Sequence, residues 1–495
     1  MSPHASDAAA VPGGQHAAPY ATALAAHAHG DWVRLNVPGH QVQPASQPGL
    51  DELFGTKIMA LDVPPLVDGL DYGPSPTPLA QSAALAAAAW GGRRTWFLTN
   101  GASKGNLVTC IALRGIGEEV VLQRSVHSSV IDGLALAGLD AHFVLPSVDT
   151  DLGISHGVTA AALADQLDAH PKSAAAYVVT PSYFGAAADV AALADVAHSR
   201  GVPLVVDEAW GSHFGFHPGL PTNALRLGAD IVISSTHKLA GSLTQSAMLH
   251  LGEGPWADRL EPLIDRAFRS MQSTSASALL MASLDLARRQ LAVNGRNTIT
   301  TSLEAAAKLR SRIVVEGRFA DPTNRMLAFD DVIAVDPLHV VIDTRAGGIS
   351  GHQARASLFQ EHQVHLEMST DSVVVAIIGA GAAPDMDRVA DALHSLPEVP
   401  GAVTAASIEL PVPGLRHSTV REAYFAETVI VSAAEAVGRI SADSVAAYPP
   451  GIPNLLPGEV ITSDAVTFLR ETVAAPFGYV RGGAAKDMSC FRVVR

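Results

Sequence analysis

The chain has 495 residues, of which 48% are hydrophobic and 16% are charged, and its formal net charge is −15. This length exceeds one ordinary hydrophobic core, so we expect two or three domains. The acidic balance, without any lysine- or arginine-rich run, makes nucleic acid and anionic membranes poor partners.

Cysteine usage and the N-terminus indicate the compartment. Cys110 and Cys490 are too few for a disulfide framework, and neither has metal-ligand spacing. Residues 1–16 lack the basic start and apolar core of a secretory signal. No stretch reaches the roughly 18 uninterrupted apolar residues of a membrane span. We therefore expect a soluble cytoplasmic protein that does not bind membranes.

Short apolar runs alternate with helical patterns from residue 95 onward. The runs lie at residues 119–123, 141–146, 176–180, 203–209 and 230–234. Between two of them, "DVAALADVAHSRG" (189–201) carries apolar residues at helical spacing and ends on Gly201. This rhythm predicts right-handed βαβ units on a large, mostly parallel sheet with helices on both faces.

The later part of the chain has a different pattern. A long helical stretch at 275–295 precedes apolar runs at 338–344, 364–370 and 372–379, which predict a smaller sheet. We expect four parts: an N-terminal segment (1–60), a large cofactor-binding domain (61–300), a small α/β domain (301–404) and a C-terminal α+β domain (405–495).

Two of the predicted strands end in reactive side chains. Asp207 ends the run in "PLVVDEA", and Lys238 follows "IVISSTH". Ligands of open parallel sheets bind at the carboxyl ends of the strands. Taken alone, the pair is equally well explained as a buried salt bridge.

A third feature favours a ligand site. "WFLTNGASKGNLVTCIAL" (96–113) reads as a strand, a Gly/Ser turn and an apolar helix. Ser103, Gly105 and the backbone amides of this turn suit a phosphate group, although such a turn is often only a helix cap. A phosphate loop, a strand-end aspartate and a strand-end lysine, in that order, meet the requirements of pyridoxal phosphate.

Several segments carry a specific resemblance to one family. They are "TNGASKGN" (99–106), "VHSSVIDGLALAG" (126–138), "VDEAWGSHFGFHP" (206–218), "SSTHKLAGSLTQSAMLH" (234–250) and "AAYPPGIPNLLPGEVIT" (446–462). The chain resembles the short form of the bacterial ornithine/lysine/arginine decarboxylases. The resemblance implies the aspartate aminotransferase type of fold (pyridoxal-phosphate transferase fold type I) and a homodimer or higher homo-oligomer with active sites at the subunit boundary.

The resemblance also implies roles for individual residues. Lys238 would be the Schiff-base lysine, Asp207 the partner of the ring nitrogen, and His127 the imidazole stacked on the ring. Ala209 would pack under the ring and Trp210 would flank it. The positions implied around the phosphate and its neighbourhood are Gly101, Ala102, Ser103, Lys104, Ser235 and His237. Lys238 or His237 would return a proton to the substrate's α-carbon.

Some positions depart from the family pattern. Ala102 stands where a second hydroxyl residue is common, and Ser128 follows His127 where the family often has lysine. The final segment, residues 484–494, matches only loosely. These departures leave the cofactor prediction unchanged and bear mainly on the identity of the substrate.

The implied activity is decarboxylation of a basic amino acid in polyamine metabolism, with arginine favoured over lysine or ornithine. Glu459 of "PGE" is the candidate for the substrate's distal cation, with a rigid connector as the alternative role of its segment. Transamination or aldol cleavage stays open, since an aminotransferase offers a C-terminal arginine for the substrate carboxylate. The candidates for that arginine are Arg421, Arg439 and Arg492. A non-catalytic regulator has no need of Lys238 and Asp207.

His213 and His217 have an i, i+4 spacing that zinc sites use. No glutamate follows the first histidine, however, and the segment reads as a turn. We therefore expect no metal site there.

Overall fold

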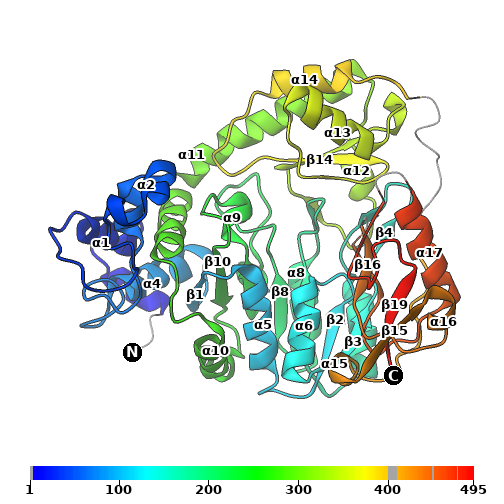
Figure 1. Cartoon of the computed structure of the whole chain (residues 1–495), viewed down its shortest axis with the longest axis horizontal. Coiled ribbons are helices and arrows are strands. Elements are labelled where there is room, and N and C mark those ends of the chain that lie inside the picture. The colour runs from blue at the N-terminus through cyan, green and yellow to red at the C-terminus, as the bar shows by residue number, and fades with distance from the viewer. Residues whose placement is uncertain (1–3, 400–409, 449–450, 476–477) are drawn as a thin grey trace.

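The computed structural model describes residues 4–399, 410–448, 451–475 and 478–495. At its centre is a seven-stranded sheet with the strand order β1-β10-β9-β8-β6-β2-β3 (Figure 1). The strands are β1 (Arg94–Leu98), β2 (Glu119–Gln123), β3 (Asp140–Val144), β6 (Ser173–Val179), β8 (Leu204–Asp207), β9 (Ile231–Ser234) and β10 (Ala247–Leu251). β10 alone runs in the opposite direction to the other strands of this sheet. The predicted mostly parallel sheet is confirmed.

Helices cover both faces of this sheet because its strands are apolar on both sides. Ile231 and Ile233 pack with α5 (Gly101–Leu113), α6 (Ser128–Ala137) and α10 (Ala257–Met271). Val232 lies between them in sequence and so points to the opposite face. There it joins the core formed with α4 (Pro78–Trp90), α7 (Ala160–Ala169) and α8 (Val190–Ser199). The strands are thus buried between two helical layers.

The N-terminal segment lies against α4 and the long helix α11 (Ala278–Glu316). It contains α1 (Pro19–Ala28), α2 (Pro48–Phe54) and α3 (Thr56–Leu61), with 3-10 turns at Ala5–Ala10, Gly14–His16 and Pro44–Ser46. Further 3-10 turns lie at Ala224–Leu227 and Arg345–Gly347. Two short pairs, β4 (Val148–Asp149) with β5 (Ile154–Ser155) and β7 (Ala186–Ala187) with β11 (Ala334–Val335), lie outside the main sheet.

α11 connects the large domain to the small one (Figure 1). Its 39 residues run without interruption through position 300, where the sequence analysis places a boundary. The small domain is a three-stranded antiparallel sheet of order β12-β14-β13: β12 (His339–Asp343), β14 (Val373–Ile377) and β13 (Met368–Ser369). α13 (Gly351–His362) and α14 (Met386–Ser395) cover it, and α12 (Thr323–Met326) precedes it.

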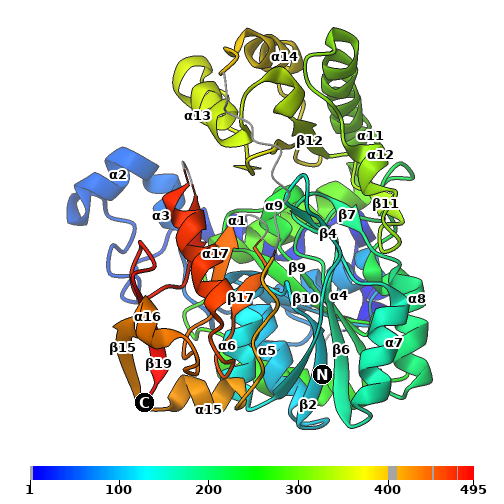
Figure 2. The ribbon, with the colours of Figure 1, turned by 90° about the vertical axis from the view of Figure 1, so that its right-hand side faces the viewer.

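The C-terminal part packs beside α6 of the large domain (Figure 2). It contains α15 (Val420–Phe425), α16 (Ala433–Ala436) and α17 (Ser463–Ala474). Its strands are β15 (Thr428–Ser432) with β19 (Cys490–Val494), and β16 (Val445–Tyr448) between β17 (Pro453–Leu455) and β18 (Tyr479–Arg481). Leu455, Leu469 and Phe491 belong to its separate hydrophobic core.

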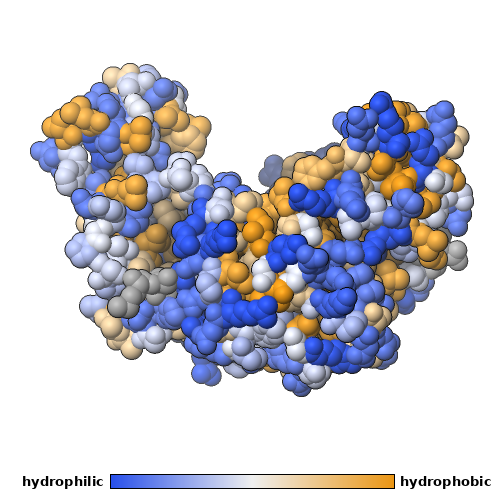
Figure 3. All heavy atoms as spheres, turned by 90° about the horizontal axis from the view of Figure 1, so that it is seen from below, coloured by the Kyte–Doolittle hydropathy of each residue, from blue (hydrophilic) through white to orange (hydrophobic). Residues whose placement is uncertain are grey.

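The lower surface of the molecule mixes hydrophilic and hydrophobic side chains (Figure 3). Among the described residues, no helix combines the length and apolar character that crossing a membrane requires.

Candidate active site

Lys238 lies at the carboxyl end of the central sheet. β9 ends at Ser234, and the single-turn helix α9 (Thr236–Leu239) then places Lys238 beyond the strand end. Its Nζ lies 3.8 Å from the ring centroid of Trp210 and 5.8 Å from that of Tyr183. Two aromatic rings therefore shield the amine from water.

Burial changes the protonation of Lys238. It lowers the pKa of the amine from 10.5 to about 8, because a desolvated ammonium is less stable than a neutral amine. The carboxylates of Asp207 and Glu367 oppose this shift, since they favour the charged form. The neutral amine, which is the nucleophilic form, is therefore accessible near pH 8.

Asp207 is the last residue of β8, the strand next to β9. Its carboxylate is buried and is oriented by two donors. The Ala209 N–H donates to Oδ1 at 3.1 Å, and the Asn106 side-chain amide donates to Oδ2 at 3.1 Å. The aspartate and the lysine thus come from neighbouring parallel strands, as the sequence analysis predicts, and no direct ion pair between them is found among the described contacts.

Asn106 is a residue that the sequence analysis missed. Its Nδ2 also donates to Ser129 Oγ at 3.0 Å, and its Oδ1 accepts from the Tyr177 hydroxyl at 2.8 Å. This buried side chain therefore links Asp207 to the start of α6 and to β6. The available signal was a polar residue on the apolar helix after the Gly/Ser turn, where a buried amide needs partners.

His127 caps the N-terminus of α6. Its Nδ1 accepts from the Ser129 N–H at 3.2 Å, so the proton of the neutral ring is on Nε2. Burial lowers the pKa of His127; Asp207 and Asp132 oppose that shift, whereas the charges of Lys238 and Arg481 add to it. The imidazole is neutral and is held close to the Asp207–Lys238 pair.

The start of α5 is the turn for which the sequence analysis predicts phosphate binding. Gly101 has φ +71°, a backbone conformation that favours glycine, and its N–H donates to the Gln245 carbonyl at 2.7 Å. The N-cap residue Asn100 makes no side-chain hydrogen bond to the helix, so its side chain does not cap the amides that follow Gly101. Ala102 is buried in this turn, Lys104 is half-buried and Ser103 is exposed.

The segment before Lys238 carries the other positions that the resemblance implies near the phosphate. Ser235 is buried, and the His237 Nδ1 is hydrogen-bonded to the Ser246 carbonyl at 2.8 Å, which fixes the ring. The neighbouring residue Gln245 accepts from the Gly101 N–H at the start of α5, so this segment and the Gly/Ser turn are held close together.

The partner of Glu459 in the structure differs from the substrate cation that the sequence analysis predicts. Its two carboxylate oxygens accept from Arg124, with Nη1–Oε1 at 2.5 Å and Nη2–Oε2 at 2.7 Å, and both side chains are buried. The sequence analysis assigned it to a substrate cation, which requires a carboxylate that is neutralised only when substrate arrives. Arg124 already neutralises Glu459, so the geometry assigns this glutamate to domain packing instead.

The three arginines that the sequence analysis considers as binding residues for the substrate carboxylate have other partners. Arg421 donates to the Ala135 and Leu136 carbonyls at 2.9 Å each. Arg439 donates to the Val494 carbonyl at 2.9 Å, and Arg492 pairs with Asp443 at 3.4 Å. The exposed Arg481 of β18 is instead the arginine whose charge reaches His127.

Neither histidine pattern forms a metal site. His213 Nε2 pairs with Asp336 at 3.0 Å, whereas His217 Nε2 bonds to Thr300 Oγ1 at 3.0 Å, so the two rings serve different partners. A separate group of Glu119, His142 and His170 has ligand atoms within 4.8 Å of one another. Its two imidazoles stack at 3.5 Å and 10°, however, and parallel rings cannot direct their in-plane lone pairs at one ion.

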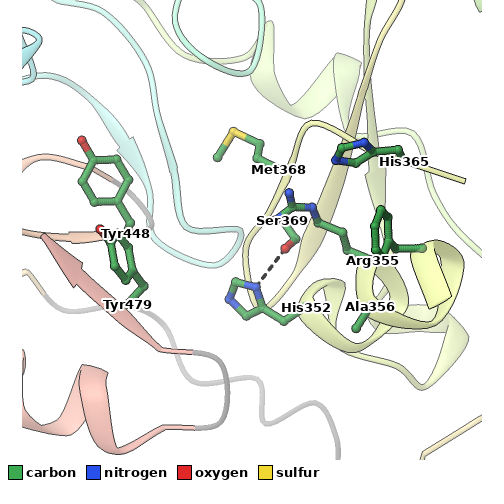
Figure 4. A pocket seen from close by; sticks show the side chains of 9 residues that line it. His352, Arg355, Ala356, His365, Met368, Ser369, Tyr448 and Tyr479 are labelled. Carbon is green, nitrogen blue, oxygen red and sulfur yellow. Dashed lines mark hydrogen bonds between the residues drawn. The ribbon is translucent and has the colours of Figure 1, made fainter. Parts of the chain in front are cut away.

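A cavity of about 550 Å³ lies between the small domain and the C-terminal domain. It is lined by Met368 and His352 on one side and by Tyr448 and Tyr479 on the other (Figure 4). Burial raises the pKa of Tyr183, which lies beside Lys238, to about 12. Tyr448, Asp207 and Glu367 add to that shift, whereas Arg481 opposes it. Residues of both outer domains therefore act electrostatically on the lysine site.

Comparisons with known proteins agree with this geometry. A family model described as Orn/Lys/Arg decarboxylase, major domain, matches residues 18–381, and the C-terminal domain model of the same family matches residues 404–475. The arginine decarboxylase of Bacillus subtilis is 33% identical over 489 residues, which covers 97% of this chain and 98% of that protein. The arginine decarboxylase of Halalkalibacterium halodurans is 34% identical over 491 residues, with the same coverage of 97% and 98%.

A solved structure supports the fold. The constitutive lysine decarboxylase of Escherichia coli aligns with a TM-score of 0.79 at 19% identity, covering 97% of this chain and 82% of that chain. At this identity the likeness concerns the fold, and it confirms the predicted fold class.

Proposed function

Because the chain belongs to the Orn/Lys/Arg decarboxylase family, we propose that it removes the α-carboxylate of arginine as carbon dioxide, with pyridoxal phosphate as its cofactor. The observation that carries the proposal is the position of Lys238 and Asp207. They lie at the ends of neighbouring parallel strands, next to the uncapped N-terminus of α5. Relatives that cover almost the whole chain are named arginine decarboxylases, which favours arginine over lysine and ornithine.

The residues present fit the cofactor. Ser103, Lys104, Ser235 and His237, with the backbone amides at the start of α5, would hold its phosphate. Asp207 would hold the proton on the pyridine nitrogen, and Lys238 would bind the aldehyde carbon covalently. His127 and Trp210 would contact the ring. When bound, pyridoxal phosphate supplies an electron-accepting ring for the electron pair released as the Cα–carboxylate bond breaks.

The chain's own residues supply orientation and protons. Asp207, fixed by Asn106 and Ala209, would place its carboxylate against the ring nitrogen. Burial favours the neutral amine of Lys238, which would be available as a proton carrier whenever it is not bound to the cofactor. Lys238 or His237 would deliver one proton to the α-carbon, which replaces the carbon dioxide that leaves.

Glu367 takes the place of Glu459 as our candidate for the substrate's distal cation. It is exposed, stands immediately before Met368 of the cavity wall, and its charge acts on both Lys238 and Tyr183, so we place the mouth of the site at this cavity. No hydrogen bond or ion pair involving its side chain is found among the described residues. A guanidinium at the mouth would gain a charge-assisted hydrogen bond from this carboxylate.

The activity is tested with purified protein and pyridoxal phosphate, supplied separately with arginine, lysine and ornithine. Release of carbon dioxide and of the corresponding amine from arginine is expected, at a higher kcat/KM than for the other two substrates. Lys238→Ala should abolish both turnover and the visible absorbance of covalently bound cofactor, whereas Lys172→Ala, an exposed lysine, should change neither. Formation of a 2-oxo acid instead of an amine would point to transamination and overturn the proposal.

Glu367 has a separate test. Glu367→Gln should raise KM for arginine about tenfold or more, because a charge-assisted hydrogen bond contributes about 1.5–3 kcal/mol. The control Glu361→Gln removes another exposed carboxylate, on α13, and should leave KM unchanged. An unaltered KM in the Glu367 variant would assign the distal charge to a different carboxylate.

The exposed N-terminal segment supports assembly of two copies. Large apolar side chains there are solvent-exposed in the single chain, including Val33 at 90%, Leu35 at 89% and Leu53 at 74%. We propose that a second copy of this chain covers them, which would form the homodimer that the family resemblance implies. Sedimentation velocity should show a dimer that Leu35→Asp with Val33→Asp dissociates; a wild-type monomer at micromolar concentration would refute it.

A further inference from the structure

A buried polar cluster lies behind Trp210 and is not used by the proposed chemistry. Its members are Asp336, His213 and His339, and all three are fully buried. Asp336 Oδ2 contacts His339 Nδ1 at 2.7 Å and His213 Nε2 at 3.0 Å. Its Oδ1 accepts from the Leu338 N–H at 3.0 Å.

The cluster joins two domains. His213 follows Trp210 by three residues in the loop after β8 of the large domain, whereas His339 begins β12 of the small domain. The Asp336 N–H donates to the Gly185 carbonyl at 2.8 Å. A Cβ at Gly185 would lie 2.7 Å from the Cβ of His339, so the segments that carry these two residues are in close contact. The carboxylate therefore cross-links the domains in a region that water does not reach.

Asp336 is the charged partner of both rings. His339 Nδ1 is hydrogen-bonded to Asp336 Oδ2 at 2.7 Å, and His213 Nε2 lies 3.0 Å from the same oxygen. Both nitrogens of His213 and the Nε2 of His339 are buried without a hydrogen-bond partner among the described residues, so Asp336 is the group that holds the two rings in place. Burial raises the pKa of Asp336, but the two imidazoles outweigh it and hold that pKa well below its usual range.

The cluster also contacts the reactive lysine through one intermediate ring. The His339 imidazole meets the Trp210 indole edge-on, with centroids 5.7 Å apart at 72°. The face of the same indole lies 3.8 Å from Lys238 Nζ. Arg310 of α11 holds the segment from its other side, donating to the Pro337 and His339 carbonyls at 2.6 and 2.8 Å.

We propose that Asp336 and His339, held in register by His213, are positioning residues that fix Trp210 against Lys238 and so couple the placement of the small domain to the reactive amine. The proposal rests on the proposed function, because it takes Lys238 as the cofactor-binding lysine. Trp210 is the nearer of the two aromatic rings that shield that amine from water. Loosening the cluster therefore admits water beside Lys238 and restores the ordinary protonation of the amine.

The test measures the amine rather than turnover. Apoprotein is mixed with pyridoxal phosphate at a series of pH values, trapped with borohydride, and the rate of labelling at Lys238 is followed by peptide mass. The wild-type rate should rise with a midpoint of about 8. In Asp336→Asn that midpoint should move up by about one unit, because the charged groups that face the amine, Asp207 and Glu367, are unchanged while its desolvation is relieved.

A matched control separates positioning from general stability. Asp285 is also fully buried and pairs with Arg288 at 2.6 Å, beneath the N-terminal segment. Asp285→Asn should lower the melting temperature without moving the labelling midpoint. If Asp336→Asn likewise lowers only the melting temperature, the positioning role is wrong.

Two milder variants keep the proposal testable if Asp336→Asn does not fold. His339→Asn retains a donor near the Nδ1 position but removes the ring against Trp210, so it should raise the midpoint. His213→Gln retains a donor near the Nε2 position and leaves the Trp210 contact, so its midpoint should stay close to wild type. Equal midpoints in both variants would overturn the proposal. Failure of wild-type protein to be labelled at Lys238 would instead refute the proposed cofactor.

Discussion

Arg124 and Glu459 form a buried, two-pronged ion pair that ties the C-terminal domain to the large domain. Arg124 follows β2 and lies three residues before His127, and its Nε also donates to the Pro453 carbonyl at 3.0 Å. The Leu456 N–H donates to Glu459 Oε2 at 2.9 Å. The "PGE" segment therefore holds the C-terminal domain against the large domain close to His127 in the sequence.

Glu459→Gln should destabilise the protein by about 3–5 kcal/mol, because it leaves the Arg124 charge buried without a counter-ion. Urea unfolding measures the change. Glu427→Gln is the matched control, since Glu427 pairs with Arg495 at 3.1 Å on the surface, and its loss should cost less than about 1 kcal/mol. A Glu459 variant of full stability with weakened arginine binding would restore the substrate role and contradict our assignment.

Asp207→Asn should reduce kcat by about two orders of magnitude or more, while some cofactor still binds. The asparagine keeps the shape and the acceptor for the Ala209 N–H, but it loses the charge that stabilises a protonated ring nitrogen. Steady-state rates with arginine measure the effect. Asp195→Asn, on the exposed face of α8, should be indistinguishable from wild type. A near wild-type rate in the Asp207 variant would show that another residue protonates the ring.

Tyr177→Phe should lower the free energy of unfolding by about 1–3 kcal/mol, because it leaves the buried Asn106 carbonyl without its 2.8 Å donor. The loss should also reduce kcat modestly, since Asn106 orients Asp207. Thermal unfolding and kcat are measured on the same preparation. Tyr424→Phe, at an exposed tyrosine, should change neither quantity. Unchanged stability in the Tyr177 variant would mean that water replaces the hydroxyl.

His250 should make the protein acid-sensitive. Complete burial lowers the pKa of this β10 imidazole from 6.5 to about 3, so the unfolded chain binds one more proton than the folded chain between those values. Stability should therefore fall by about 1.4 kcal/mol per pH unit from this group as pH decreases from about 6.5 towards 3.

His250→Gln keeps a polar partner for Thr95, whose Oγ1 lies 2.8 Å from His250 Nδ1, but it cannot titrate. Urea unfolding at several acidic pH values should show a shallower pH dependence for the variant. His16→Gln, at an exposed histidine on the N-terminal segment, serves as control and should keep the wild-type slope. Equal slopes for the wild-type protein and the His250 variant would contradict the neutral buried state.

The amino-acid sequence alone determined the alternation of strands and helices, because apolar runs that alternate with amphipathic helices are typical of a mostly parallel sheet covered on both faces. It also determined that Asp207 and Lys238 lie at the same end of the sheet, since Asp207 ends β8 and Lys238 comes four residues after the end of β9. The Gly/Ser turn before α5 is equally local, as its glycine adopts the left-handed conformation that the helix start requires.

Only the tertiary structure decided which side chains surround that edge. Arg124 and Glu459 are 335 positions apart, and no local pattern indicates that packing of the C-terminal domain against α6 would join them. The charge of Glu367 acts on Lys238 from the small domain, and the charge of Arg481 acts on His127 from the C-terminal domain. The physical reason is that a strand end fixes the direction of its own residues, whereas the partner of a charged side chain depends on which domain surfaces pack together.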